Sequence, residues 1–149
     1  MDDLVQWPRA QLDEDERTAQ ATLWDDDGAL GSGGWFAYDR GPREGFREAR
    51  WVVIDRADEG VVDSRPQAAD DQAVARHIAE WDPARVLREI DAKRMTIALC
   101  APPLVDVTGP GDTERSYVPG EGPPWGLDVL KLLALPYADR LGYRDEWRP

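Results

Sequence analysis

Apolar residues in the first part of the chain recur with a helical period. An imperfect stripe is formed by Leu4, Trp7, Leu12, Ala19 and Leu23. It predicts an N-terminal helix that Asp2 or Asp3 can cap. Pro8 fits a first helical turn but kinks a helix interior, so we expect the helix either to begin near Trp7 or to be bent there. The turn-forming run of residues 25–28 is expected to end it.

Three strand-like runs follow, at residues 34–39, 46–55 and 60–63. Gly41-Pro42 separates the first two runs, and residues 57–60 have the composition of a hairpin loop between the second and third. The pattern predicts a small three-stranded antiparallel meander. Its buried face is expected to carry Trp35, Trp51, Val53 and either Val61 or Val62.

Two consecutive helices are predicted next. The first is expected to open near Pro66, with an apolar face formed by Val74, His77, Ile78 and Trp81. Asp82 can then cap a second helix whose first residue is Pro83. This second helix is expected over residues 83–100, with one side formed by Val86, Leu87, Ile90, Arg94, Ile97 and Ala101.

Residues 102–126 hold six prolines and five glycines, which predicts a long, irregular and mobile loop. A short helix is expected over residues 127–135, where Pro136 stops it. The tail, residues 137–149, carries tyrosine and tryptophan and is expected to dock rather than fray. The whole pattern predicts an α+β fold in one domain, residues 1–149.

The composition excludes several classes of protein. The chain has 149 residues, a net charge of −12 and one cysteine, so an internal disulfide and a cysteine-rich zinc site are ruled out. The acidic balance argues against direct nucleic-acid binding and against docking on an anionic membrane. No apolar run approaches the ~18 residues of a membrane span. We therefore expect a soluble cytoplasmic protein without a metal or another cofactor.

The negative charge is concentrated in the first 27 residues, which hold nine acids and two bases. Asp13, Glu14, Asp15 and Glu16 form its densest run. Such a run commonly forms a solvated helix face that keeps a protein soluble. The alternative is an acidic surface for a basic protein partner.

Two loops that resemble ligand-binding motifs lack the required chemistry. The glycine-rich residues 31–34 follow a helix and precede a strand, without lysine, whereas a phosphate cradle leads from a strand into a helix. We expect a turn there. Aligning Gly28 with the glycine of a calcium loop puts Leu23 and Gly34 where oxygen ligands are needed, so a calcium site is not expected.

His77 is the only histidine, and it shares the predicted apolar face with Ile78. We expect a buried or core-edge residue, hydrogen-bonded to a neighbour; the alternative is a general base held by Asp82 or Asp71. Cys100 lies late in an apolar helix and is expected to be an inert core thiol. Among the seven tryptophans, Trp125 is the one expected to be exposed.

Three blocks carry a resemblance to a known family. They are residues 1–17, which begin MDDLV, residues 77–94, HIAEWDPARVLREIDAKR, and residues 132–149, LLALPYADRLGYRDEWRP. They resemble an uncharacterised family of small proteins from actinobacteria and their phages, a domain of unknown function. In that family the middle block often has a second histidine where this chain has Trp81, and some relatives carry cysteines before the last helix. These departures remove support for a metal role.

The resemblance implies a shared partner-binding site at the matching residues that are not plainly core. These residues are His77, Asp82, Arg85, Tyr137, Asp139, Tyr143, Glu146 and Trp147. Together with Trp125 and the acidic run they make the set of candidate binding residues. No constellation of catalytic residues was found among them.

Three functions remain open at this point. The leading hypothesis is an acidic accessory protein, not an enzyme, that acts by binding another protein. The second is a DNA mimic that inhibits a nucleic-acid-binding host or defence protein through the carboxylates of residues 13–27. The third is a small enzyme that uses His77 with nearby carboxylates.

Overall fold

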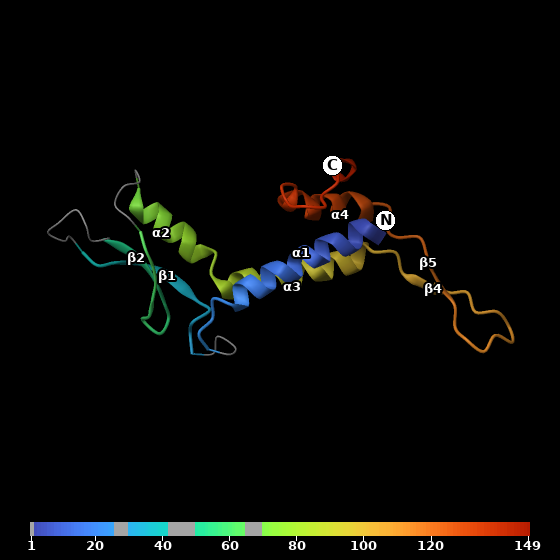
Figure 1. The fold of residues 1–149 in the computed structure, drawn as a ribbon, viewed down its shortest axis with the longest axis horizontal. Helices are drawn as coiled ribbons and strands as arrows, with labels where there is room; N and C mark the ends of the chain where they lie inside the picture. Colours follow the sequence, from blue (N-terminus) through green and yellow to red (C-terminus); the bar gives the residue numbers. More distant parts are fainter. Residues whose placement is uncertain (1, 26–29, 42–49, 65–69) are drawn as a thin grey trace. The chain divides into compact units, whose positions relative to one another are not determined.

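A computed structural model describes residues 2–25, 30–41, 50–64 and 70–149. The fold is α+β, as predicted (Figure 1). Its elements in chain order are α1 (Asp2–Gln20), β1 (Trp35–Asp39), β2 (Trp51–Asp55), β3 (Gly60–Asp63), α2 (Asp71–Glu80), α3 (Pro83–Cys100), β4 (Leu104–Asp106), β5 (Tyr117–Pro119) and α4 (Gly126–Ala134), followed by the 3₁₀ turns Leu135–Tyr137 and Asp145–Trp147. No helix among the described residues is long and apolar enough to cross a membrane.

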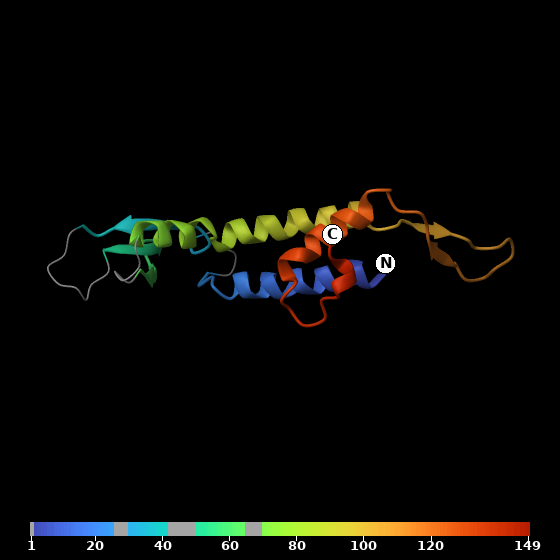
Figure 2. The same ribbon diagram turned by 90° about the horizontal axis from the view of Figure 1, so that it is seen from above.

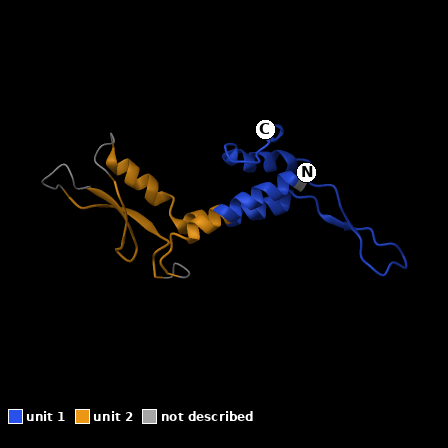
Figure 3. Ribbon diagram, viewed as in Figure 1, with its two compact units in different colours: residues 1–14, 91–149 blue, residues 15–90 orange. Residues whose placement is uncertain are grey.

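The chain divides into two compact units (Figure 3). Unit 1 contains Met1–Glu14 and Asp91–Pro149, and unit 2 contains Asp15–Ile90. The division falls inside α1 and α3, so each of these helices contributes to both units. The sequence predicts one domain over residues 1–149, and this remains a prediction.

Unit 2 is built on the three-stranded antiparallel sheet β1-β2-β3, with the predicted meander order. Ala37 of β1 lies opposite Val53 of β2, and Val53 lies opposite Val62 of β3. Helix α2 packs on β1 and β2, where Val53, Ala75 and Ala79 form a buried cluster. Partly buried hydrophobic residues complete this cluster, among them the predicted core residues Trp35 and Trp51.

The third strand was wrongly expected to join the core. Val61 is 38% exposed and Val62 is 40% exposed. The register shifts between Val53 and Ile54, which is the mark of a bulge in the β2–β3 ladder. Because α2 packs on β1 and β2, the side chains of β3 lie beside the covered area rather than under the helix.

The orientation predicted for α2 is also wrong. Ala75 and Ala79 are buried, whereas Val74, His77 and Trp81 are exposed; of the predicted face, Ile78 alone packs, partly buried, against the core. Alanine side chains let a helix approach a sheet closely, and larger side chains at these two positions would hold it away. The helix begins at Asp71 with Asp70 as its N-cap, and the expected start near Pro66 lies outside the described residues.

Helix α3 begins and ends where the sequence predicts. Asp82 caps it, because its Oδ1 accepts a hydrogen bond of 2.6 Å from the backbone N–H of Arg85. Ile90, Ile97 and Cys100 are buried along it. Burial raises the pKa of the Cys100 thiol, which agrees with the expected inert core cysteine.

Unit 1 pairs the first part of α1 with the second part of α3. Figure 2 shows these two helices side by side, and Arg94 Nη2 lies 2.5 Å from Asp13 Oδ1. Helix α1 begins at Asp2, so the alternative in which it begins near Trp7 is wrong. Pro8 lies inside the helix and is buried, and α1 ends at Gln20 rather than in the run 25–28.

The C-terminal tail docks on unit 1, as predicted. Trp147 is 5% exposed, and its ring centroid lies 5.3 Å from that of Trp7. Tyr137 and Tyr143 pack edge-on against the same Trp7 ring. The expected short helix before the tail is present as α4, one residue earlier than predicted.

The segment 102–126 is not irregular throughout. Strands β4 and β5 form an antiparallel hairpin within it, with Val105 opposite Val118. Figures 1 and 2 both show this hairpin extending away from the helices of unit 1. The expectation that the segment is mobile stays a prediction.

Candidate functional site

The β4–β5 hairpin, residues 103–120, is the first candidate site. Backbone hydrogen bonds hold both its ends: Gly120 N–H donates to Pro103 O at 2.7 Å, and Val107 N–H donates to Ser116 O at 2.8 Å. These bonds fix the register of the two strands independently of the rest of unit 1.

The tip of the hairpin is organised by two aspartates. Asp106 Oδ1 accepts hydrogen bonds from the hydroxyl and from the backbone N–H of Thr108, and these bonds lower the pKa of Asp106. Asp112 Oδ2 accepts from the Gly109 N–H at 2.8 Å. Gly111 has φ of +102°, a conformation that glycine adopts without strain. The sequence of the tip therefore specifies a definite turn.

Both faces of the hairpin expose apolar side chains. Between 44% and 70% of each of these side chains is exposed: Leu104, Val105, Val107, Tyr117 and Val118. A two-stranded hairpin without a third strand or a covering helix is marginally stable in water. An exposed apolar surface of this kind makes the hairpin a candidate interaction site.

The two open edges of the hairpin differ. Because residues 103/120 and 107/116 are hydrogen-bonded pairs, the alternation of an antiparallel ladder makes Leu104/Pro119 and Asp106/Tyr117 non-hydrogen-bonded pairs. Their backbone groups point outward. On β5 the residue Pro119 has no N–H, so that edge lacks a hydrogen-bond donor for an added strand. On β4 both outward residues keep their N–H groups. The edge of β4 can therefore accept another strand.

A cavity of about 310 Å³ lies at the foot of the hairpin. Leu104 and Pro119 line it from the hairpin, and Val5 and Arg9 line it from α1. Trp125, which precedes α4, is 53% exposed, but it is not distinguished as expected, because Trp24 is also 53% exposed and Trp81 is 46% exposed.

The hairpin is not among the candidate sites expected from the sequence. The signal was present in two short runs rich in β-branched and aromatic residues, 104–108 and 116–118, on either side of a glycine- and proline-containing turn. The proline and glycine content of the whole segment outweighed it.

The predicted residues of the middle block are brought together on unit 2. The rings of His77 and Trp81 have centroids 6.4 Å apart, and the Arg85 guanidinium lies 4.4 Å from the Trp81 ring centroid. Arg85 Nε also contacts Glu89 Oε1 at 2.9 Å. These contacts make a packed corner between α2 and α3.

The expectation of a buried or core-edge His77 is wrong, because the residue is exposed on α2. The carboxylate of Asp82 does not orient the imidazole: its oxygens accept from the backbone N–H groups of Arg85 and Trp35, at 2.6 and 3.4 Å. Asp71 Oδ1 is buried without a hydrogen-bond partner in the described part of the chain. A general-base role needs the imidazole of His77 to be held by Asp82 or Asp71, and neither contact is found among these atoms.

The acidic run is engaged within the molecule. Asp13 pairs with Arg94, and Glu14, Asp15 and Glu16 have interaction partners as well. Asp25 accepts hydrogen bonds from the Leu30 N–H and the Ser32 hydroxyl. Asp26 and Asp27 lie outside the described residues. Carboxylates that are engaged within the molecule resemble the free phosphates of DNA less closely, which weakens the DNA-mimic alternative.

The tail residues separate into two groups. Tyr137 and Trp147 are buried and Tyr143 is partly buried, and all three rings pack against Trp7, while their role in partner binding stays a prediction. Asp139 and Glu146 are exposed. The aromatic residues of this block therefore hold the tail in place.

Comparison with known proteins gives a family and no function. No curated protein and no solved structure matches the chain. The model of a family of unknown function, DUF6221, matches residues 1–149. Because the match extends over the whole sequence, the chain belongs to the DUF6221 family.

Proposed function

We propose that this chain is an acidic accessory protein that binds another protein by adding a partner strand to the open edge of β4. The observation that carries the proposal is a hairpin that exposes apolar side chains on both faces and whose β4 edge keeps its outward backbone N–H groups. Strand addition gives affinity through backbone hydrogen bonds and specificity through alternate side chains.

Charge indicates the chemistry of the partner. Residues 102–126 contain four acids and one base, and the whole chain has a net charge of −12. A partner that combines an apolar strand with basic side chains would be steered toward this surface, and an acidic one would be repelled. The cavity at the foot of the hairpin offers a place for one apolar side chain of that strand.

The setting of this activity also belongs to the proposal. The resemblance of the three blocks supports an actinobacterial or actinophage protein, and the composition supports a cytoplasmic one. The DNA-mimic and His77-enzyme alternatives gain no supporting observation, because Asp13 and Asp25 are engaged and Asp82 caps α3.

A site-specific photo-cross-linker tests the proposal in actinobacterial cells. It is placed at Val107, in the hairpin, and at Leu141, which is 99% exposed in the tail and serves as the matched control. We expect a protein adduct from position 107 that is absent from position 141. The adducted protein is then purified and its affinity for the untagged chain is measured.

Two substitutions of Leu104 distinguish the contribution of its backbone N–H to binding from the contribution of its side chain. Leu104→Pro removes one of the two outward N–H groups of β4 without touching the internal ladder, and Leu104→Ser removes only the apolar side chain. Strand addition requires that Leu104→Pro weaken binding about tenfold more than Leu104→Ser. Equal effects of the two variants, or identical adducts from positions 107 and 141, would refute the proposal.

A further inference from the structure

Unit 2 contains a cavity of about 520 Å³ that the proposed function does not use. It lies between the loop of residues 30–34 and the first turns of α3. Leu23 and Leu87 contribute apolar wall, and Arg56 and Arg88 contribute positive charge. Its volume falls within the range of small-molecule sites.

The glycine loop positions Arg56. The backbone N–H of Arg56 donates to Gly34 O at 3.1 Å and to Gly31 O at 3.3 Å. A Cβ on Gly34 would lie 2.9 Å from Arg56 Nε, and a Cβ on Gly31 would lie 2.9 Å from Arg56 Cβ. The absence of side chains at these two glycines therefore allows the arginine to lie flat against the loop.

The positive charge of this cavity is not neutralised by the described residues. No ion pair of Arg56 or Arg88 is found among them. The acid in the wall is Asp82, whose two oxygens already accept from the Arg85 and Trp35 N–H groups. Both arginines are exposed to solvent, so their guanidinium groups are accessible to a ligand in the cavity.

The N-terminus of α3 does not supply the binding groups. Pro83 has no N–H, the Ala84 N–H donates to Gly33 O at 2.9 Å, and the Arg85 N–H donates to Asp82. The positively charged groups of the wall that can hold an anion are therefore the guanidinium groups of Arg56 and Arg88.

We propose that this cavity binds a small organic phosphate. Arg56, from the turn after β2, and Arg88, from α3, would each bind different oxygens of one phosphate group, which offers three acceptor oxygens where a carboxylate offers two. Leu23 and Leu87 would contact the apolar body of the ligand. This site is independent of the hairpin.

Titration calorimetry at physiological salt tests the proposal with phenyl phosphate, inorganic phosphate and benzoate as probes. Phenyl phosphate is expected to bind most tightly, because it alone combines the phosphate with an apolar ring. Arg56→Gln and Arg88→Gln are each expected to weaken it about tenfold. Arg76→Gln, an exposed arginine on α2 outside this cavity, makes the same charge change and is expected to leave binding unaltered.

Gly34→Ala provides a variant that keeps both arginines. Its Cβ would displace the Arg56 guanidinium, so a several-fold loss of phenyl phosphate affinity is expected while the circular dichroism spectrum is kept. No saturable binding of phenyl phosphate would overturn the proposal. Tighter binding of benzoate, or an equal loss in Arg76→Gln, would overturn it as well.

Discussion

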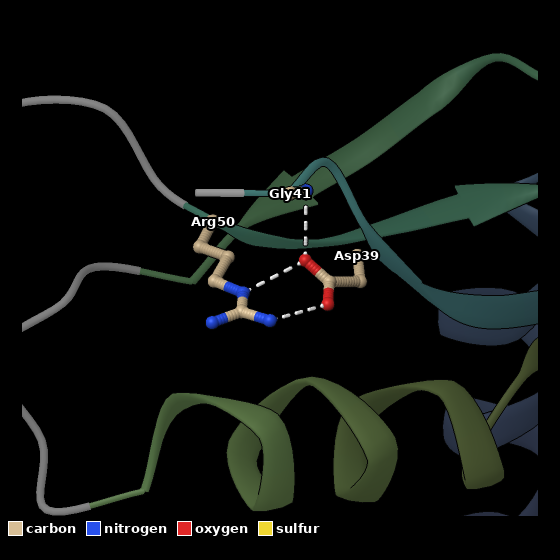
Figure 4. Close-up of polar contacts among 3 residues, drawn as sticks. All are labelled: Asp39, Gly41 and Arg50. Atoms are coloured by element: carbon tan, nitrogen blue, oxygen red, sulfur yellow. Dashed lines mark hydrogen bonds and ion pairs between the residues drawn. The ribbon is translucent and has the colours of Figure 1, made fainter. Parts of the chain in front are cut away.

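Asp39 and Arg50 form a bidentate ion pair across the end of the β1–β2 ladder (Figure 4). Arg50 Nε donates to Asp39 Oδ1 and Nη2 donates to Oδ2, both at 2.8 Å. The Gly41 N–H adds a third bond to Oδ1 at 2.8 Å. Three donors on one carboxylate hold the ends of the two strands together in the register that pairs Asp39 with Trp51.

The first prediction concerns the pH dependence of this pair. The Arg50 guanidinium, and after it the Gly41 N–H, lower the pKa of Asp39 to about 2 from the ordinary 3.8. A carboxyl whose pKa is lower in the folded state stabilises the fold fully above its unfolded pKa and loses that contribution as the pH falls through the folded value. Urea unfolding should therefore show wild type more stable than Asp39→Asn at pH 5, with a gap that closes between about pH 4 and pH 2.

The control for this prediction is the same comparison in an Arg50→Gln background. Because the Arg50 hydrogen bond is the largest cause of the shift, the pH dependence of the gap should mostly disappear there. A gap that closes equally in both backgrounds would show that Arg50 is not responsible.

The second prediction concerns Asp55, which is 1% exposed on β2. Burial raises the pKa of this carboxyl, but hydrogen bonds from Trp24 Nε1 (2.6 Å) and from the Glu59 and Ala57 N–H groups outweigh burial and lower it. Asp55→Ala leaves three donors without their acceptor and should cost about 2–3 kcal/mol, measured by urea unfolding. Trp24→Phe removes one donor and should cost less; a larger loss in Trp24→Phe would contradict this account.

The third prediction concerns the docked tail. Trp147 is buried against Trp7, so Trp147→Ala should cost about 3–5 kcal/mol in unit 1. Trypsin should then cut faster after Arg140 and Arg144, because the undocked segment becomes accessible. Leu141→Ala, at a fully exposed position of the same tail, should leave both stability and proteolysis unchanged. Unaltered cleavage in Trp147→Ala would show that the tail is held by other contacts.

Local signals account for the elements that the sequence predicts well. Helix α3 begins at the predicted residue because Asp82-Pro83 specifies both the cap and the first turn within two residues. The meander order follows from turn residues between short strands. These signals need no knowledge of what packs against them.

Tertiary contacts decide the features that the sequence did not predict. Val62 alternates correctly for a buried strand, yet it is exposed because α2 packs on β1 and β2. Which N–H groups of β4 point outward depends on which residue pairs are hydrogen-bonded, and the register of the two strands decides this. Arg56 and Arg88 are 32 positions apart in the chain, and only the fold brings them to the wall of the same cavity.

The fourth prediction tests the orientation of α2, for which the sequence and the structure disagree. Ala75 is fully buried against Val53, so Ala75→Leu should overpack the helix–sheet contact and cost about 1–3 kcal/mol by urea unfolding. Val74 is 41% exposed, so Val74→Ala should change stability by no more than about 0.5 kcal/mol. Sequence periodicity, which placed Val74 on the buried face, expects the opposite order. A costly Val74→Ala with a tolerated Ala75→Leu would therefore restore the orientation predicted from sequence, because no other rotation of the helix exchanges the two effects.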